Sequence, residues 1–156
     1  MNNEVIAAVQ TQLNHERQNA QRYLYMSAGF NNMAYPGFSK FFKSQAEGEM
    51  GHADLLADLL ISKGIMPEYW YVPAVILTVG VREYAQVAYQ TELLTTEALK
   101  ELYETADTYR DHQVCALVHD MLVEQIEEEN LALDFLNQVQ RTDENGWEVL
   151  DMKYSK

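Results

Sequence analysis

Apolar residues recur at steps of three and four along four segments of the chain, and each of these stripes turns polar at its middle. The first stripe is Val5, Val9, Gln12, Glu16, Asn19, Tyr23, Met26, Phe30 and Met33, and the second is Phe38, Phe42, Gln45, Glu49, His52, Leu56 and Leu59. The third is Val81, Ala85, Ala88, Glu92, Thr95, Leu99, Leu102, Ala106 and Tyr109, and the fourth is Val114, Leu117, Met121, Gln125, Glu128, Ala132, Phe135 and Val139. Residues at this spacing share one face of an α-helix. The pattern therefore predicts four amphipathic helices.

The middle of each stripe carries a carboxylate, at Glu16, Glu49, Glu92 and Glu128, and His52 lies three residues after Glu49 on the same face. When helices of similar length pack side by side, their midpoints come to one level whichever way each helix runs. The four carboxylates should therefore meet. Unpaired buried charges cost far more than the packing of their helices returns. A pair of bound metal ions would remove this conflict, so the pattern predicts a metal site at the centre of a bundle.

Turn residues set the order of the helices. The segment 31–37, with Pro36 and Gly37, predicts a short turn and hence an antiparallel first pair, and Gly64 is expected to end the second helix. The segment 64–80 is too long for a tight hairpin and too apolar for a loose linker. We interpret it as an ordered crossover along the bundle, after which the second and third helices run in the same direction. A second short turn is expected near residues 109–112.

These features together predict an all-α fold. The 156 residues are expected to form one domain, with a four-helix bundle over 3–140, a long crossover between its second and third helices, and a short fifth helix over 145–154. Only three prolines occur in the chain, and all are expected to lie between helices. Ala, Leu, Glu, Gln and Met are frequent, and these residues favour helix.

The charge balance limits the possible partners. Eleven basic residues stand against 24 acidic ones, a net charge of −13, which argues against nucleic acid and favours cations. A single cysteine, Cys115, excludes an internal disulfide. The sequence shows neither a signal peptide nor an apolar stretch that could span a membrane, so we expect no membrane partner and a cytoplasmic location.

Three motifs carry a family resemblance. They are the sequence QAEGEMGH over residues 45–52, the placement of Glu16 seven residues before Tyr23, and the sequence VEQIEEE over residues 123–129. Together they resemble the non-haem ferritins of bacteria and archaea, over nearly the whole chain. The resemblance implies a hollow shell of twenty-four subunits that oxidises ferrous iron with oxygen or peroxide and deposits a ferric mineral inside.

The resemblance also implies roles for individual residues. Glu16, Glu49 and His52 would bind one iron. Glu49, Glu92 and Glu128 would bind the second, so that Glu49 bridges the two. Gln125 would lie beside the second iron, where it is a possible ligand, and Tyr23 would lie near the centre as a hydrogen-bond or electron donor. Carboxylate and imidazole ligands suit iron in both oxidation states.

The ligand set is asymmetric, and one familiar position is missing. The fourth helix has Gln125-x-x-Glu128 where a symmetric di-iron bundle would have a second Glu-x-x-His pair, so the second iron should be held more weakly. Many relatives also have a glutamate just before the bridging one, which serves a third iron site. Here that residue is Gly48. Glu124 and Glu127 are possible ligands of a third iron, although a role in surface solvation explains them equally well.

Four alternatives to a non-haem ferritin are compatible with parts of the pattern. Met50 follows the bridging glutamate, as the haem-binding methionine does in bacterioferritins, but the absence of a second Glu-x-x-His pair makes haem the less favoured interpretation. A soluble di-iron oxidase or peroxidase of the rubrerythrin type would have a more symmetric site. A purely structural bundle would need basic residues at the stripe centres, and the stripes have none there. A DNA-protecting mini-ferritin is disfavoured, because its ligands lie at a dimer interface.

The remaining histidines and aromatic residues give weaker signals. His15 points about 100° away from Glu16 around the helix, which favours a surface role. His112 and His119, with Asp111, either line a channel for iron or belong to a solvated turn, and the solvated turn is favoured. The crossover also carries three adjacent aromatic residues, Tyr69, Trp70 and Tyr71. We expect their side chains to be buried anchors or contacts between subunits.

Overall fold

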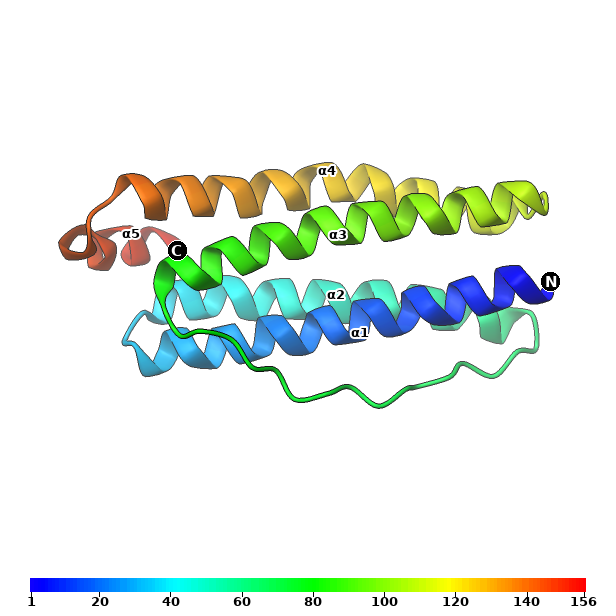
Figure 1. The fold of residues 1–156 in the computed structure, drawn as a ribbon, viewed down its shortest axis with the longest axis horizontal. Coiled ribbons are helices and arrows are strands. Elements are labelled where there is room, and N and C mark those ends of the chain that lie inside the picture. The colour runs from blue at the N-terminus through cyan, green and yellow to red at the C-terminus, as the bar shows by residue number, and fades with distance from the viewer.

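The computed structural model describes residues 1–156, and all of its regular secondary structure is helical, as the sequence predicts. The helices are α1 (Asn3–Asn32), α2 (Pro36–Ser62), α3 (Val81–Thr108), α4 (His112–Arg141) and α5 (Trp147–Tyr154), with a 3₁₀ turn at Glu144–Gly146 before α5 (Figure 1). The first four helices form a long bundle, and α5 closes one of its ends. None of the five helices has a stretch that is both long and apolar enough to cross a membrane.

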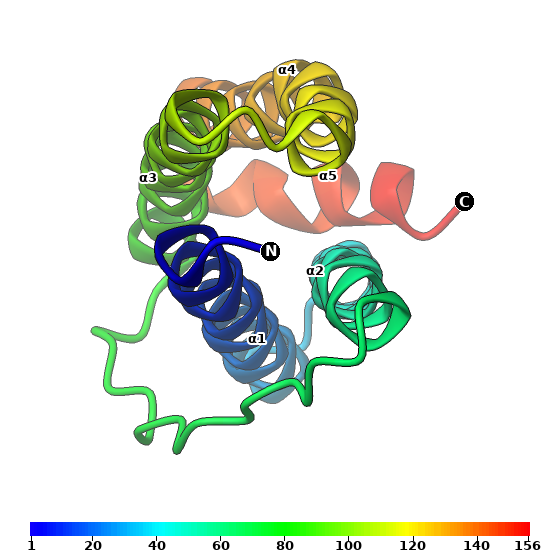
Figure 2. The ribbon, with the colours of Figure 1, turned by 90° about the vertical axis from the view of Figure 1, so that its right-hand side faces the viewer.

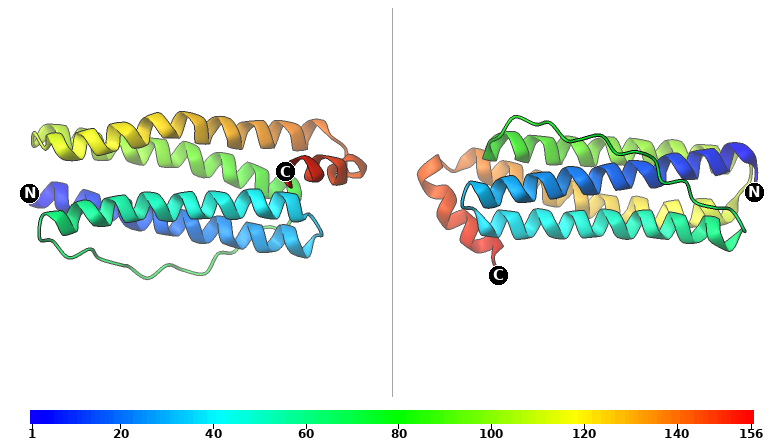
Figure 3. Two further views of the ribbon diagram at one scale, coloured as in Figure 1. Left: turned by 180° about the vertical axis from the view of Figure 1, so that it is seen from behind. Right: turned by 90° about the horizontal axis from the view of Figure 1, so that it is seen from below.

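The bundle consists of two antiparallel pairs, α1 with α2 and α3 with α4. The segment between α2 and α3 crosses the full length of the bundle along its outside, so that α2 and α3 run in the same direction (Figures 1 and 3). This order confirms the predicted crossover. Viewed from the end, α1 lies against α3, while α2 and α4 stand further apart across the bundle (Figure 2).

The turn between α1 and α2 is shorter than predicted. Pro36 was expected within it, but it is the first residue of α2. Proline suits this position because its fixed φ matches the helix and the first amide of a helix has no partner within the helix. Gly64 lies beyond the end of α2 as predicted, with φ at 72°, a left-handed conformation that glycine adopts without steric cost.

Side chains of α1 hold the crossover in place through its backbone. Amide and guanidinium groups on one face of α1 donate hydrogen bonds to carbonyls two or three residues apart along the crossover, and the pairs are Gln10 with Met66, Asn14 with Glu68, Arg17 with Trp70, and Gln21 with Pro73. The amides of Glu68 and Trp70 donate back to Gln10 and Asn14. Within the subunit, the expectation that Tyr69, Trp70 and Tyr71 are buried anchors is wrong, because all three side chains are exposed. Hydrogen bonds from α1 side chains, rather than buried apolar side chains, hold the crossover against the bundle.

Two apolar clusters fill the two ends of the bundle. One contains Phe30, Phe38, Phe42 and Phe135 near α5, and the other contains residues such as Leu13, Leu56, Leu60, Leu99 and Val118 near the opposite end. Buried polar side chains separate the two clusters. This arrangement is the one that the polar middles of the four stripes predict.

Helix α5 is part of the subunit core. Trp147 and Leu150 are buried in the apolar cluster at that end of the bundle. The carboxylate of Asp151 is also buried, and it accepts hydrogen bonds from the backbone amides of Gly37 (3.1 Å) and Phe38 (2.7 Å). Tyr35, the residue that precedes α2, provides no side-chain cap of its own. Asp151 therefore caps α2 from a distant part of the chain.

Candidate metal centre

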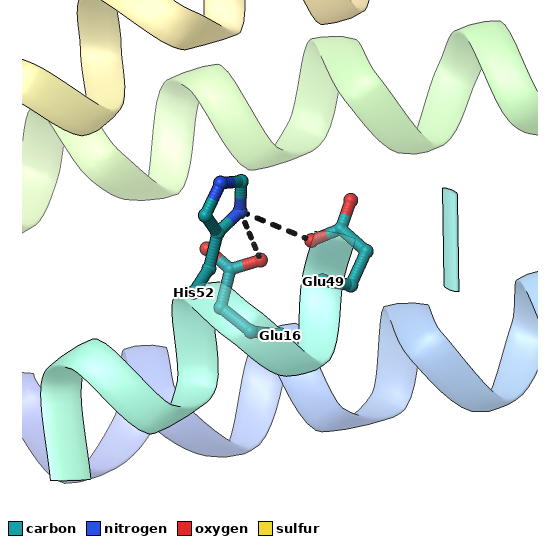
Figure 4. Close-up of side chains that lie close together, drawn as sticks. All are labelled: Glu16, Glu49 and His52. Carbon is teal, nitrogen blue, oxygen red and sulfur yellow. Dashed lines mark ion pairs between the residues drawn. The ribbon is translucent and has the colours of Figure 1, made fainter. Parts of the chain in front are cut away.

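Glu16 of α1 meets Glu49 and His52 of α2 in the polar layer between the two apolar clusters (Figure 4). One ligand atom from each of the three residues lies within 4.8 Å of the other two. The Nδ1 atom of His52 is 3.7 Å from Oε2 of Glu49 and 4.0 Å from Oε2 of Glu16. These separations are too long for hydrogen bonds. They suit ligands that share one ion, because atoms about 2.1 Å from a first-row metal lie about 3 to 4 Å from each other.

Two buried carboxylate oxygens in this group have no hydrogen-bond partner. They are Oε2 of Glu16 and Oε2 of Glu49, the same atoms that face His52. The other oxygen of Glu16 accepts a hydrogen bond from Gln12, one helical turn earlier on α1 (2.9 Å). Buried polar atoms are almost always paired, and an unpaired one costs about 1 to 3 kcal/mol. Two unpaired oxygens directed at one imidazole nitrogen therefore fit a cation bound between them.

Glu92 of α3 is fully buried, and two neighbours fix its carboxylate. The hydroxyl of Tyr23 donates to Oε1 (2.5 Å), and the amide nitrogen of Gln125 donates to Oε2 (2.6 Å). The same amide nitrogen also donates to the backbone carbonyl of Glu92 (3.0 Å). The structure thus places Tyr23 and Gln125 as hydrogen-bond donors to Glu92. Glu128, one turn after Gln125 on α4, lies partly buried beside this group.

The pKa values of the four carboxyl groups are all raised, because burial and neighbouring carboxylates disfavour their charged forms. Burial raises the pKa of Glu49 to about 8, with a further contribution from the charges of Glu92 and Glu128. Burial and the charge of Glu92 raise the pKa of Glu128 to about 7. Burial also raises the pKa of Glu92, and burial together with Glu49 raises the pKa of Glu16 well above its ordinary range. A cluster of this kind is poised to exchange protons for bound cations.

The outer nitrogen of His52 has its own partner. Nε2 of His52 lies 2.9 Å from a carboxylate oxygen of Glu124 on α4. When Nε2 carries the proton and donates to Glu124, Nδ1 presents its lone pair toward Glu16 and Glu49. Carboxylates commonly orient metal-binding histidines in this way. Glu127, the other acid considered for a third site, is exposed.

His15 is not the surface residue that its angle on the helix suggested. It is partly buried, and its Nε2 lies 3.1 Å from Oγ1 of Thr95 on α3. Oγ1 of Thr95 also accepts from the amide of Asn19 (2.8 Å) and donates to the carbonyl of Thr91. Burial and the charge of Arg22 lower the pKa of His15. The expectation failed because α1 packs against both α2 and α3, so that two of its faces are covered.

The candidate channel residues lie at the start of α4, and their exposure in the subunit is compatible both with a solvated turn and with a channel. His112 and His119 are exposed, and the carboxylate of Asp111 accepts from the amide of Val114 (3.1 Å) as the cap of α4. The sequence analysis did not predict the hydrogen bond from Gln12 to Glu16. That contact could have been found, because Gln12 lies four residues before Glu16 on the same stripe. The contact from Glu124 to His52 joins residues 72 positions apart and had no local signal.

A four-helix bundle that gathers carboxylates from all four helices and one imidazole at its centre is typical of the di-iron carboxylate proteins. Residues 6–142 match the family model for the ferritin-like domain, and the chain therefore belongs to that family. This result confirms the resemblance inferred from the sequence motifs.

Individual relatives agree with the family. The chain is 25% identical over 153 residues to a bacterial non-heme ferritin of Bacteroides fragilis, covering 92% of this chain and 91% of the relative. It is 27% identical over 143 residues to the bacterial non-heme ferritin of Staphylococcus haemolyticus, with 89% and 86% covered. Among solved structures, an open-pore ferritin from Archaeoglobus fulgidus superposes with a TM-score of 0.94 at 25% identity, over 99% of this chain and 96% of that one. A ferritin from the green alga Ulva pertusa gives 0.91 at 26% identity, over 99% and 84%.

Proposed function

We propose that this protein stores iron, and that it oxidises its substrate, ferrous iron, at the centre of each subunit before depositing it as ferric mineral. Membership of the ferritin family and the non-heme ferritins among its relatives support iron storage. One observation supports the oxidation site above all others. The two buried carboxylate oxygens without partners, on Glu16 and Glu49, both face Nδ1 of His52.

The proposed ligands divide into two overlapping sets. Glu16, Glu49 and His52 hold the first iron, and Glu49, Glu92 and Glu128 hold the second. Glu49 bridges both ions, which keeps them close enough for one oxidant molecule to react with both. The second set has only oxygen ligands, so it binds ferrous iron more weakly than the first. A weak second site suits a substrate that must leave after oxidation.

Tyr23 and Gln125 act on the second iron through Glu92. Their hydrogen bonds to its two oxygens hold the carboxylate in one orientation. Burial and the charge of Glu92 raise the pKa of Tyr23 well above its ordinary range, so the phenol keeps its proton and remains a donor. When iron binds, Glu92 has to share its oxygens between the metal and these donors, which further weakens the site and favours release of the oxidised product.

The proposal extends to the assembly and its setting. Structural relatives of this chain are ferritins, and this supports a hollow homo-oligomeric shell, for which we propose twenty-four subunits. The net charge of −13 per chain would draw cations toward such a shell. We propose that the oxidant is oxygen or hydrogen peroxide and that the shell works in the cytoplasm, without bound haem.

Stopped-flow measurement of ferrous oxidation tests the site. Glu49→Ala and His52→Ala should each abolish the fast phase, because the first variant removes the shared ligand and the second removes the imidazole. Helical content measured by circular dichroism should be unchanged. Glu47→Ala, an exposed glutamate on the same helix, is the matched control and should react like the unmodified protein. Unchanged initial rates in the Glu49 or His52 variant would refute the assignment.

A further inference from the structure

The hydroxyl of Thr95 on α3 is the meeting point of a hydrogen-bond network with α1. Its Oγ1 atom accepts from the amide of Asn19 (2.8 Å) and donates to the backbone carbonyl of Thr91 (2.9 Å). Nε2 of His15 lies 3.1 Å from the same oxygen. A hydroxyl has one proton and two lone pairs. Because the proton goes to Thr91, Nε2 of His15 must carry a hydrogen and donate it, so the hydroxyl is fully bonded and α1 supplies two of its three partners.

This network is buried and leaves little freedom to its members. The side chains of Asn19 and Thr95 are both buried, and a guanidinium nitrogen of Arg22 donates to Oδ1 of Asn19 (3.1 Å). That bond directs the amide nitrogen of Asn19 toward Thr95. Two apolar residues at these positions would give similar stability. A fully satisfied polar network, however, specifies one arrangement. The network therefore fixes how α1 and α3 lie against each other.

The contact between α1 and α3 also sets how the two antiparallel helix pairs are placed. The pairs pack on each other mainly through α1 and α3, while α2 and α4 stand further apart (Figure 2). The proposed ligands of the first iron, Glu16, Glu49 and His52, all come from α1 and α2. The second iron takes Glu49 from that pair, but it takes Glu92 and Glu128 from the pair of α3 and α4. Only the second iron site therefore depends on the placement of one pair against the other.

The bonds to Thr95 lie close to the second site without using any of its ligands. Thr95 is three residues after Glu92, and Asn19 is three residues after Glu16, so each lies within one turn of a proposed ligand. The other side-chain hydrogen bond between α1 and α3 runs from Tyr23 to Glu92. Iron competes with that bond for the carboxylate of Glu92. The bonds to Thr95 face no such competition, so they hold the two pairs together whether or not iron is bound.

We propose that Thr95 is a positioning residue, which holds the two helix pairs at the separation at which Glu49 bridges both irons. The proposal rests on the proposed function. The hydroxyl of Thr95 binds no iron itself, and it acts through the placement of α3 and hence of Glu92. Without this hydroxyl, the first iron site keeps its affinity and the second loses it.

Anaerobic calorimetric titration with ferrous iron separates this role from general stabilisation. Thr95→Val keeps nearly the same shape without the hydroxyl, and it should weaken binding of the second ferrous ion by about tenfold while the first binds as in the native protein. Thr95→Ser retains the hydroxyl and should restore the second site. Thr91→Val is the matched control, because it makes the same substitution at a buried threonine that enters the network only through its backbone carbonyl. Equal weakening of both sites, or an unchanged second site in Thr95→Val, would overturn the proposal.

Crystal structures of the metal-free variants test the role without iron. In Thr95→Val, the distance between the Cα atoms of Glu49 and Glu92 should increase by about 0.5 Å or more, which exceeds the tolerance of a preorganised site. The same distance in Thr91→Val should match that of the native protein, and a native distance in Thr95→Val would overturn the proposal. Asn19→Ala leaves the hydroxyl of Thr95 paired with His15 and serves if Thr95→Val does not fold. If the native protein binds fewer than two ferrous ions per chain, the proposed iron function fails, while these distances still decide whether Thr95 places the two pairs.

Discussion

Glu49→Gln should make the metal-free protein more stable at high pH. Glu49 is 4% exposed, and its burial beside other carboxylates raises its pKa from 4.5 to about 8. The folded protein therefore binds this proton more tightly than the unfolded chain does. The stabilisation is complete below pH 4.5 and is lost as the pH rises through about 8. Glutamine has nearly the same shape and never acquires the charge.

The size of the effect follows from the pKa difference. Each pH unit between the two pKa values costs about 1.4 kcal/mol per group, so the charged Glu49 removes on the order of 3 to 5 kcal/mol from the metal-free subunit. For a chain of this length, that corresponds to roughly 10 °C in the unfolding midpoint. Near and below pH 4.5 the side chain is protonated in the unfolded chain as well as in the folded protein, so the variant and the native protein should unfold at nearly the same temperature there.

Thermal unfolding followed by circular dichroism at pH 5, 7 and 9, with a chelator and at one fixed protein concentration, measures this difference. The midpoint of the native protein should fall with pH more steeply than that of Glu49→Gln, so the two curves should begin to separate above the unfolded pKa of 4.5 and reach their full separation above about pH 8. Glu47→Gln is the control for loss of an exposed charge from the same helix. Adding Zn²⁺ at pH 7 should restabilise the native protein and leave Glu49→Gln nearly unaffected. Parallel curves for Glu49→Gln and the native protein would refute the reasoning.

Three further substitutions test separate parts of the structure. Glu128→Ala should retain about one tightly bound ferrous ion per chain in anaerobic calorimetric titration, because only the second ligand set is damaged; loss of both ions would show that the ligands are divided wrongly. Glu124→Ala should weaken binding at the His52 site by about 10- to 100-fold in the same titration, whereas Glu124→Gln, which still accepts a hydrogen bond, should recover most of the affinity. Asp151→Ala should lower the free energy of unfolding by about 1 to 2 kcal/mol in urea, because α2 loses its cap, and an unchanged urea midpoint would contradict this role.

The overall fold could be predicted because its determinants are local. A stripe of apolar residues specifies a helix and its buried face, and the polar middle of each stripe specifies where the carboxylates lie. The crossover was predictable from its length and its apolar composition. Pro36 was placed incorrectly because the same residue ends a helix when it lies inside one and begins a helix when it lies at the first position.

Contacts between distant segments could not be predicted. His52 with Glu124 and Gly37 with Asp151 join positions that no periodicity relates. The burial of the His15 side chain depends on the packing of α1 against both α2 and α3. The aromatic residues of the crossover looked like anchors because apolar side chains are usually buried, yet hydrogen bonds from α1 to the crossover backbone hold the segment instead.

The most direct test of the central claim is the amount of iron in the assembled particle. Protein loaded anaerobically with ferrous iron, oxidised in air and separated by size-exclusion chromatography should elute as one large shell carrying far more than two irons per chain. Glu49→Ala should form the same shell without rapid iron uptake. If the native protein elutes only as a monomer or dimer and never retains more than two irons per chain, storage is contradicted and a soluble di-iron oxidase becomes the better account.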